Sequence, residues 1–92
     1  EDPTYESYNV FPNPVRPNYS GPVTMQGIRY NSDVKITDAG GNLVYKTTSN
    51  GGTATWNCRA LNGQRVASGV YYIWTATNVG KDKKVGKVLI MN

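Results

Sequence analysis

The sequence predicts an all-β domain, an antiparallel β-sandwich of about seven strands. Short runs rich in β-branched and aromatic residues recur along the 92 residues, and clusters of Gly, Pro and Asn separate them. No window keeps apolar residues at a helical period over ten positions, because Gly, Pro, Asn and Thr interrupt each one. A chain of this length forms one domain with a thin core. These observations favour a sandwich of the immunoglobulin-like kind.

The strands follow from the spacing of the β-rich runs between turn residues. We treat residues 1–92 as a single domain, with residues 1–7 expected to be a linker from an upstream domain. The expected strands are Tyr5–Val10, Pro22–Gly27, Asp33–Asp38, Leu43–Thr48, Thr53–Asn57, Gly69–Thr77 and Val85–Met91.

Alternation of apolar and polar residues assigns the faces of these strands. In an antiparallel strand that is buried on one side, every second residue points into the core. In the last strand the inward pair is expected to be Val88 and Ile90, because Lys87 and Leu89 share the other face. The expected core residues are Val34, Ile36, Trp56, Tyr71, Ile73, Val88 and Ile90.

The connections carry their own signals. Residues 11–17 contain three prolines, which lack a backbone donor, so this segment is expected to be an extended edge or a crossing between sheets. Residues 38–42 are expected to close a hairpin, and residues 50–52 and 61–64 to form tight turns. The basic cluster Lys81-Asp82-Lys83-Lys84 is also expected to lie in a turn.

The residue types needed for catalysis and metal binding are scarce. The chain has no histidine, six acidic residues and one cysteine, Cys58. General acid–base catalysis and zinc binding rely mainly on histidine and cysteine, and no calcium-binding loop pattern occurs. We therefore expect no catalytic residues, no metal ligands, no cofactor and no enzymatic activity. Cys58 is expected to be a half-buried filler, because little beside Arg59 would lower the pKa of its thiol.

Surface features allow few partners. The net charge of +4 is mild, so we expect no nucleic-acid binding, and no apolar run is long enough for a transmembrane helix. Asn18-Tyr19-Ser20 is only formally a glycosylation sequon. The sixth strand is apolar on both faces, so Tyr72 and Trp74 form a candidate exposed aromatic interface. Together with Tyr30 and Tyr45 they would suit sugar stacking, but packing under a neighbouring domain or along the sheet is the favoured alternative.

Five motifs in a fixed order carry a family resemblance that covers nearly the whole chain. They are Val10-Phe11-Pro12-Asn13-Pro14, Val34-Lys35-Ile36-Thr37-Asp38, Ala54-Thr55-Trp56-Asn57, Arg65-Val66-Ala67-Ser68-Gly69-Val70-Tyr71 and Lys87-Val88-Leu89-Ile90. The set resembles the C-terminal sorting domain of the type IX (Por) secretion system. Within that family, Asn13-Pro14-Val15-Arg16-Pro17 followed by Tyr19-Ser20-Gly21 is most similar to PorZ-like proteins, which carry the domain behind β-propeller repeats. The Ser-Gly-Val-Tyr stretch is also similar to the Ig-like domain of the flagellar hook-capping protein. Cys58 departs from the family, which usually has glycine there.

The resemblance implies a non-catalytic domain that directs a larger protein through the type IX system to the cell surface, passing through the periplasm. The implied partners are a receptor of the secretion machinery and the upstream domain, with lipopolysaccharide or another glycan as a further possibility. The candidate recognition surface is Pro12, Asn13, Pro14, Lys87 and Leu89. Two alternatives stay open, a structural Ig-like spacer that packs on its parent protein and a carbohydrate-binding sandwich.

Overall fold

Two antiparallel β-sheets pack face to face to form the sandwich, seen in a computed structural model that describes residues 9–28, 32–76 and 81–92. These residues contain seven strands and no helix. One sheet has the order β1-β2-β5 and the other the order β4-β3-β6-β7. The strands are β1 (Asn9–Phe11), β2 (Val23–Gln26), β3 (Asp33–Thr37), β4 (Leu43–Thr48), β5 (Thr53–Trp56), β6 (Gly69–Ala76) and β7 (Asp82–Ile90).

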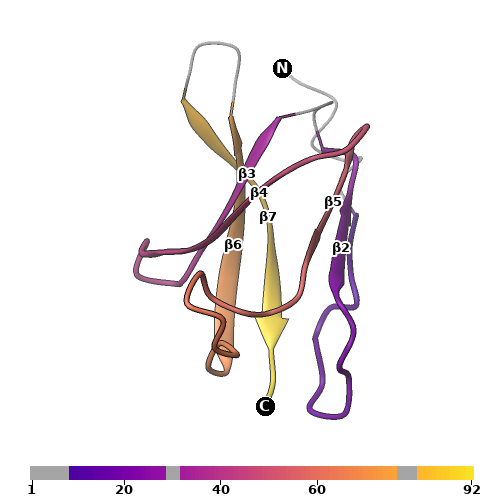
Figure 1. Cartoon of the computed structure of the whole chain (residues 1–92), viewed down its shortest axis with the longest axis vertical. Helices are drawn as coiled ribbons and strands as arrows, with labels where there is room; N and C mark the ends of the chain where they lie inside the picture. Colours follow the sequence, from indigo (N-terminus) through magenta and orange to yellow (C-terminus); the bar gives the residue numbers. More distant parts are fainter. Residues whose placement is uncertain (1–8, 29–31, 77–80) are drawn as a thin grey trace.

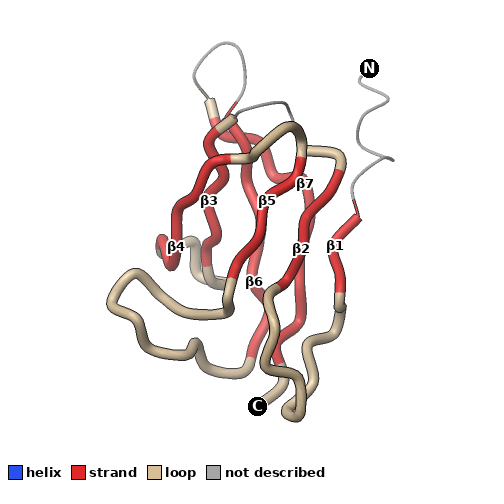
Figure 2. Tube along the Cα trace, turned by 45° about the vertical axis from the view of Figure 1, so that its right-hand side comes forward, coloured by secondary structure: helices blue, strands red, loops and turns tan. Residues whose placement is uncertain are grey.

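The strand boundaries agree closely with those expected from the sequence, and the differences lie at the two ends. Strand β1 starts at Asn9, and residues 5–8 of the expected first strand lie outside the described residues. Figure 1 shows β2 and β5 as a layer separate from β3, β6 and β7, and Figure 2 shows β1 beside β2. The chain therefore changes sheet between β2 and β3, between β4 and β5, and between β5 and β6.

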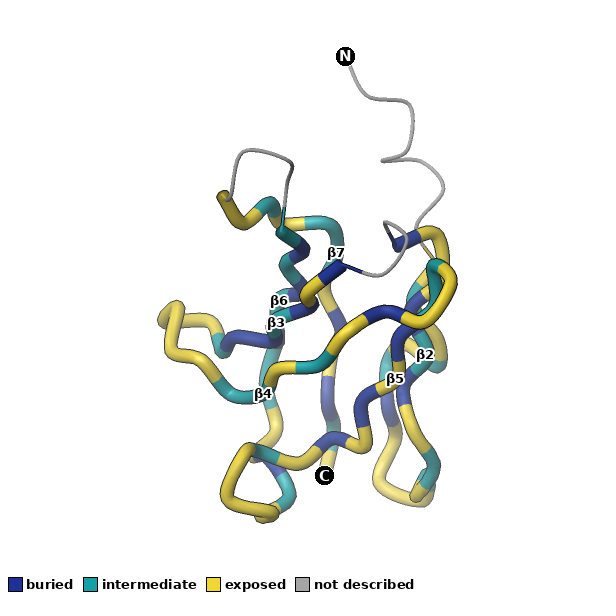
Figure 3. The backbone as a smooth tube through the Cα atoms, turned by 45° about the horizontal axis from the view of Figure 1, so that its top comes forward, coloured by how far each residue is buried: buried dark blue, intermediate teal, exposed yellow. Residues whose placement is uncertain are grey.

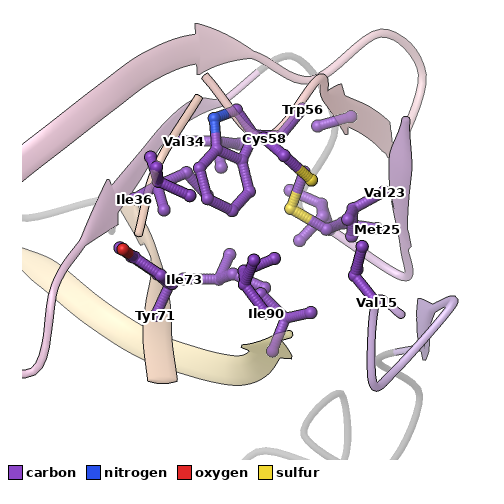
Figure 4. Close-up of a cluster of buried hydrophobic side chains, with 14 residues drawn as sticks. Val15, Val23, Met25, Val34, Ile36, Trp56, Cys58, Tyr71, Ile73 and Ile90 are labelled. Carbon is purple, nitrogen blue, oxygen red and sulfur yellow. The ribbon is translucent and has the colours of Figure 1, made fainter. Parts of the chain in front are cut away.

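The core lies between the two sheets, where the inward residues of both meet (Figure 3). All seven residues expected in the core are buried, and Ile36, Ile73, Val88 and Ile90 have no exposed surface. In Figure 4 the three-stranded sheet and its loops contribute side chains that sequence alternation had not singled out. These additional residues include Val15, Val23, Met25 and Cys58.

Residues 38–42 close the hairpin between β3 and β4, as the sequence predicts. Gly41 adopts a φ of 87°, which a residue with a β-carbon rarely reaches. The carboxylate of Asp38 accepts hydrogen bonds from the backbone N–H groups of Gly40 (3.0 Å) and Asn42 (2.9 Å). Hydrogen bonds from Asn42, from its backbone first, hold the pKa of Asp38 below its usual value. The carboxylate therefore stabilises the turn in its ionised form.

The expectation that the basic cluster forms a turn is wrong. Strand β7 already begins at Asp82, and Asp82, Lys83 and Lys84 pair with residues 76, 75 and 74 of β6. The physical reason is that β7 is an edge strand, where charged side chains reach solvent and also discourage aggregation. Asp82 also forms an ion pair with Lys35, with 2.8 Å between Oδ2 and Nζ, so a lysine of the same sheet neutralises its charge.

Cys58 occupies a backbone position that suits glycine. Its φ is 63°, the only positive value among the described residues other than glycine. The side chain is fully buried, not half-buried as the sequence suggested, because the turn after β5 aims it between the sheets. Its thiol pKa is raised by burial, with Arg65 acting weakly in the opposite direction, so the thiol stays protonated and unreactive at neutral pH.

Replacing Cys58 should reveal the backbone strain at this turn. A left-handed conformation costs a residue with a β-carbon about 1–2 kcal/mol, and glycine avoids this cost. A buried methyl group is worth about 0.8 kcal/mol. We therefore expect Cys58→Ala and Cys58→Gly to have unfolding free energies within about 1 kcal/mol of each other. Urea denaturation measures both variants, and a glycine variant less stable than the alanine variant by well over that margin would contradict the assigned strain.

Candidate recognition surface

The proline-containing segment that follows β1 crosses to the other sheet and lies against the free edge of β7. Val15 forms a parallel bridge with Ile90. Its N–H donates to the carbonyl of Leu89 at 2.8 Å, and its carbonyl accepts from the N–H of Met91 at 2.8 Å. The sequence expectation of an edge or crossing segment is therefore confirmed, with Figure 2 showing its run toward the end of the sandwich where the C-terminus lies.

Asn13 extends this pairing with its side chain. Its Nδ2 donates to the carbonyl of Lys87 at 3.1 Å, and its Oδ1 accepts from the N–H of Leu89 at 3.1 Å. One N–H of the carboxamide and its C=O point to the same side, as the backbone N–H and C=O of a single strand residue do, so the side chain can take the place of a strand residue at this edge. Asn13 lies 74 positions before Lys87 and 76 before Leu89 in the sequence. The contact therefore joins the first and the last family motif into one surface.

The structure brings together all five residues of the candidate recognition surface. Asn13 is exposed, and its neighbours Pro12 and Pro14 are half-buried. On β7, Lys87 is exposed and Leu89 keeps 40% of its surface in solvent. The side chains of Val88 and Ile90 alternate with these two and face the core. The outer face of β7 therefore presents Lys87 and Leu89 beside the Asn13 contact.

The C-terminal end of β7 is fixed by hydrogen bonds to the loop before β6. The backbone N–H of Asn92 donates to Ser68 Oγ at 2.8 Å, and its Nδ2 donates to the Val66 carbonyl at 2.9 Å. Arg65 Nε donates to Asn92 Oδ1 at 3.3 Å. Both flanks of the strand end are therefore held, one by the segment with Asn13 and the other by residues 65–68.

The two candidate aromatic residues lie on the outer face of the four-stranded sheet and are only half-buried. Trp74 donates its Nε1–H to Thr37 Oγ1 at 2.8 Å, which fixes the indole against β3. The ammonium of Lys84 lies 4.6 Å from the centre of the Tyr72 ring. Tyr45 pairs with Ile36 and packs against the core, so it cannot join an outer aromatic row. Tyr30 lies outside the described residues.

Within residues 9–28, 32–76 and 81–92, titratable side chains do not gather into a reactive cluster. No group of three or more His, Cys, Asp or Glu residues is placed to hold a metal ion there. Asp38 holds a turn and Asp82 pairs with Lys35. The same residues contain no helix long and apolar enough to cross a membrane.

Comparison with known proteins gives one family and two structures. The family model "Secretion system C-terminal sorting domain" matches residues 9–91. PorZ of Porphyromonas gingivalis, an essential bacterial surface component of the type IX secretion system, matches over 95% of this chain with 39% identity and a TM-score of 0.80. This chain spans 12% of the PorZ chain. The flagellar hook-capping protein FlgD of Xanthomonas campestris matches over 76% of this chain and 58% of its own, with 20% identity and a TM-score of 0.48. No curated protein matches the chain.

Proposed function

Because the chain belongs to the family of secretion system C-terminal sorting domains, which serve type IX secretion, we propose that it is recognised as a folded surface centred on Asn13 and β7. A receptor of the secretion machinery binds this surface. The domain itself does no chemistry. The cargo is the protein to which the domain is attached, and its destination is the cell surface or the medium beyond the outer membrane.

One observation carries the proposal. The side chain of Asn13 bonds to the backbone of both Lys87 and Leu89, so the first and last motifs of the chain meet only when the domain is folded. An unfolded chain would hold the same residues more than seventy positions apart. A receptor that binds across this contact therefore selects folded cargo domains.

The geometry favours this role over carbohydrate binding. Sugar-binding platforms present free aromatic faces, but Lys84 already occupies one face of the Tyr72 ring and Trp74 is fixed to Thr37. The alternative of a structural spacer that packs on its parent protein predicts no export, so the reporter experiment below separates it from the sorting role. No residue of the described structure supports attachment to lipopolysaccharide.

Export of a reporter tests the proposal. The whole chain is fused behind a folded periplasmic reporter and expressed in a bacterium with a working type IX system. We expect the reporter outside the cell, and we expect it in the periplasm when the secretion system is deleted. A reporter that reaches the medium equally well without the secretion system, or stays in the periplasm with it, would contradict the sorting role.

A surface variant then tests where recognition takes place. Leu89→Glu places a charge on an exposed position beside the Asn13 contact, and exposed substitutions usually change stability by less than about 0.5 kcal/mol. We expect reduced export with an unchanged melting temperature. Leu61→Glu is the matched control, because Leu61 is 62% exposed and its N–H donates to the carbonyl of Val44 on β4, at the edge of the sheet opposite β7. Equal export of both variants would place recognition elsewhere.

A further inference from the structure

The outer face of the four-stranded sheet is divided into zones by the strand registers. One row across the sheet contains Lys46, Lys35, Trp74 and Lys84, each opposite the next. The adjacent row contains Thr37, Tyr72 and Lys87. Beyond it lie Val70 and Leu89, which are paired with each other. The face therefore passes from a lysine and aromatic zone to an apolar end.

A β-bulge creates the basic centre of this face. Ile73 pairs with Gly86 but the next residue, Trp74, pairs with Lys84, so Val85 is the extra residue of β7. Strict alternation from Val88 would have pointed Lys84 into the core. The bulge turns Val85 toward the core and Lys84 outward over the Tyr72 ring. Lys84 and Lys87 thus lie on the same side of the sheet in a groove of about 380 Å³ that Tyr72 also lines.

The lysine row is unfavourable for the isolated sheet. Lys35 and Lys46 are direct cross-strand neighbours, and like charges in that position are destabilising. Asp82 neutralises Lys35 at 2.8 Å. Among the described residues of this face, the exposed cations of Lys46, Lys84 and Lys87 thus outnumber the remaining carboxylate. That carboxylate belongs to Asp33, at the end of the sheet beyond the lysine row. A negatively charged ligand would offset this excess of positive charge.

We propose that this face docks an acidic, partly apolar segment of a protein partner, with a carboxylate in the groove between Lys84 and Lys87 and an apolar side chain on Val70 and Leu89. The proposal rests on the sorting function and names the chemistry of the partner in that function. The lysines of this face favour acidic residues in the partner because their charges are complementary. The exposed Leu89 favours an apolar side chain beside them. Asp33 and Asp82 lie at the other end of the face, where their carboxylates would repel a polyanion that runs its full length. The face therefore favours a short acidic segment over a nucleic acid.

Titration of the ¹⁵N-labelled protein with a peptide measures the docking. The probe is a twelve-residue peptide of alternating Glu and Leu, and the control peptide has Gln in place of Glu. We expect chemical-shift changes at Tyr72, Lys84 and Lys87 with the acidic peptide, weakening as salt is added. The double variant Lys84→Gln/Lys87→Gln should bind at least tenfold more weakly, whereas Arg59→Gln, on the loop after β5, should bind normally. Equal binding of the Gln peptide, shifts on another face, or tighter binding of a dT₁₂ oligonucleotide would overturn the proposal.

Export of the reporter fusion separates this proposal from the sorting function. We expect Lys84→Glu/Lys87→Glu to reduce export at least fivefold while the melting temperature stays near that of the unaltered domain. If the unaltered domain is exported through the type IX system and the folded double variant is exported equally well, the docking face is wrong and the sorting function stands. If the unaltered domain gives no export, the sorting function fails, and with it the partner named here.

Discussion

Removal of residues 85–92 is expected to leave the domain without a folded core. The deletion takes away most of β7, and with it the longest strand pairing of the fold, that between β6 and β7. It also removes Val88 and Ile90, which are fully buried and contribute about 1.5–3 kcal/mol each. Val15 loses its partners Leu89 and Met91, so the crossing segment comes loose as well. These losses compare with a total stability of about 5–15 kcal/mol for a small domain.

Near-ultraviolet circular dichroism and ¹⁵N–¹H spectra measure the outcome for the truncated chain. We expect poorly dispersed resonances, no cooperative thermal transition, and a reporter fusion held in the periplasm. Met91→Ala is the matched control, because it shortens a half-buried side chain just beyond β7 and leaves the strand in place. A truncated chain that melts cooperatively would show that the remaining strands form a sufficient core, contrary to this expectation.

Trp56→Ala is expected to lower the free energy of unfolding by about 3–5 kcal/mol. Trp56 keeps only 1% of its surface exposed and heads the largest fully buried side chains of the described residues. Its ring packs on Tyr71 of the opposite sheet, with 5.6 Å between ring centroids and an interplanar angle of 59°. Alanine leaves a large cavity between the sheets, where neighbouring side chains relax only in part (Figure 4).

Urea denaturation of three proteins tests this expectation. Trp56→Phe keeps much of the ring volume but loses the hydrogen bond from Nε1 to the Arg59 carbonyl at 2.8 Å, so we expect a loss of about 1–3 kcal/mol. Thr55→Ala, an exposed neighbour on the same strand, should change the midpoint little. If the free energy of unfolding falls no further in the alanine variant than in the phenylalanine variant, filling the space between the sheets is not how Trp56 stabilises the domain.

Much of the fold could be predicted because its signals are local. Alternation over four or five residues decides which side of a strand is buried, and this placed Val34, Ile36 and Val88 in the core. Turn residues decide where strands end, as Gly41 does after β3. The family motifs point to type IX sorting because their order is a property of the chain itself.

Local signals failed where a charge or a bulge changed the pattern. The lysines at residues 81–84 have the composition of a loop, yet residues 82–84 complete a strand because β6 offers them an unpaired partner edge. The outward orientation of Lys84 depends on the extra residue Val85, and no alternation rule anticipates a bulge. Complete burial of Cys58 was likewise missed, because it depends on the path of the turn after β5.

The sequence by itself thus determined the fold class, most strand positions, the central core and the family of this protein. Only the tertiary structure decided that Asn13 bonds across the edge of β7 and that Lys84 and Lys87 share a groove with Tyr72. The physical reason is the range of the interactions. Alternation and turn propensity act between near neighbours, whereas an edge contact between residues more than seventy positions apart exists only after both sheets have packed.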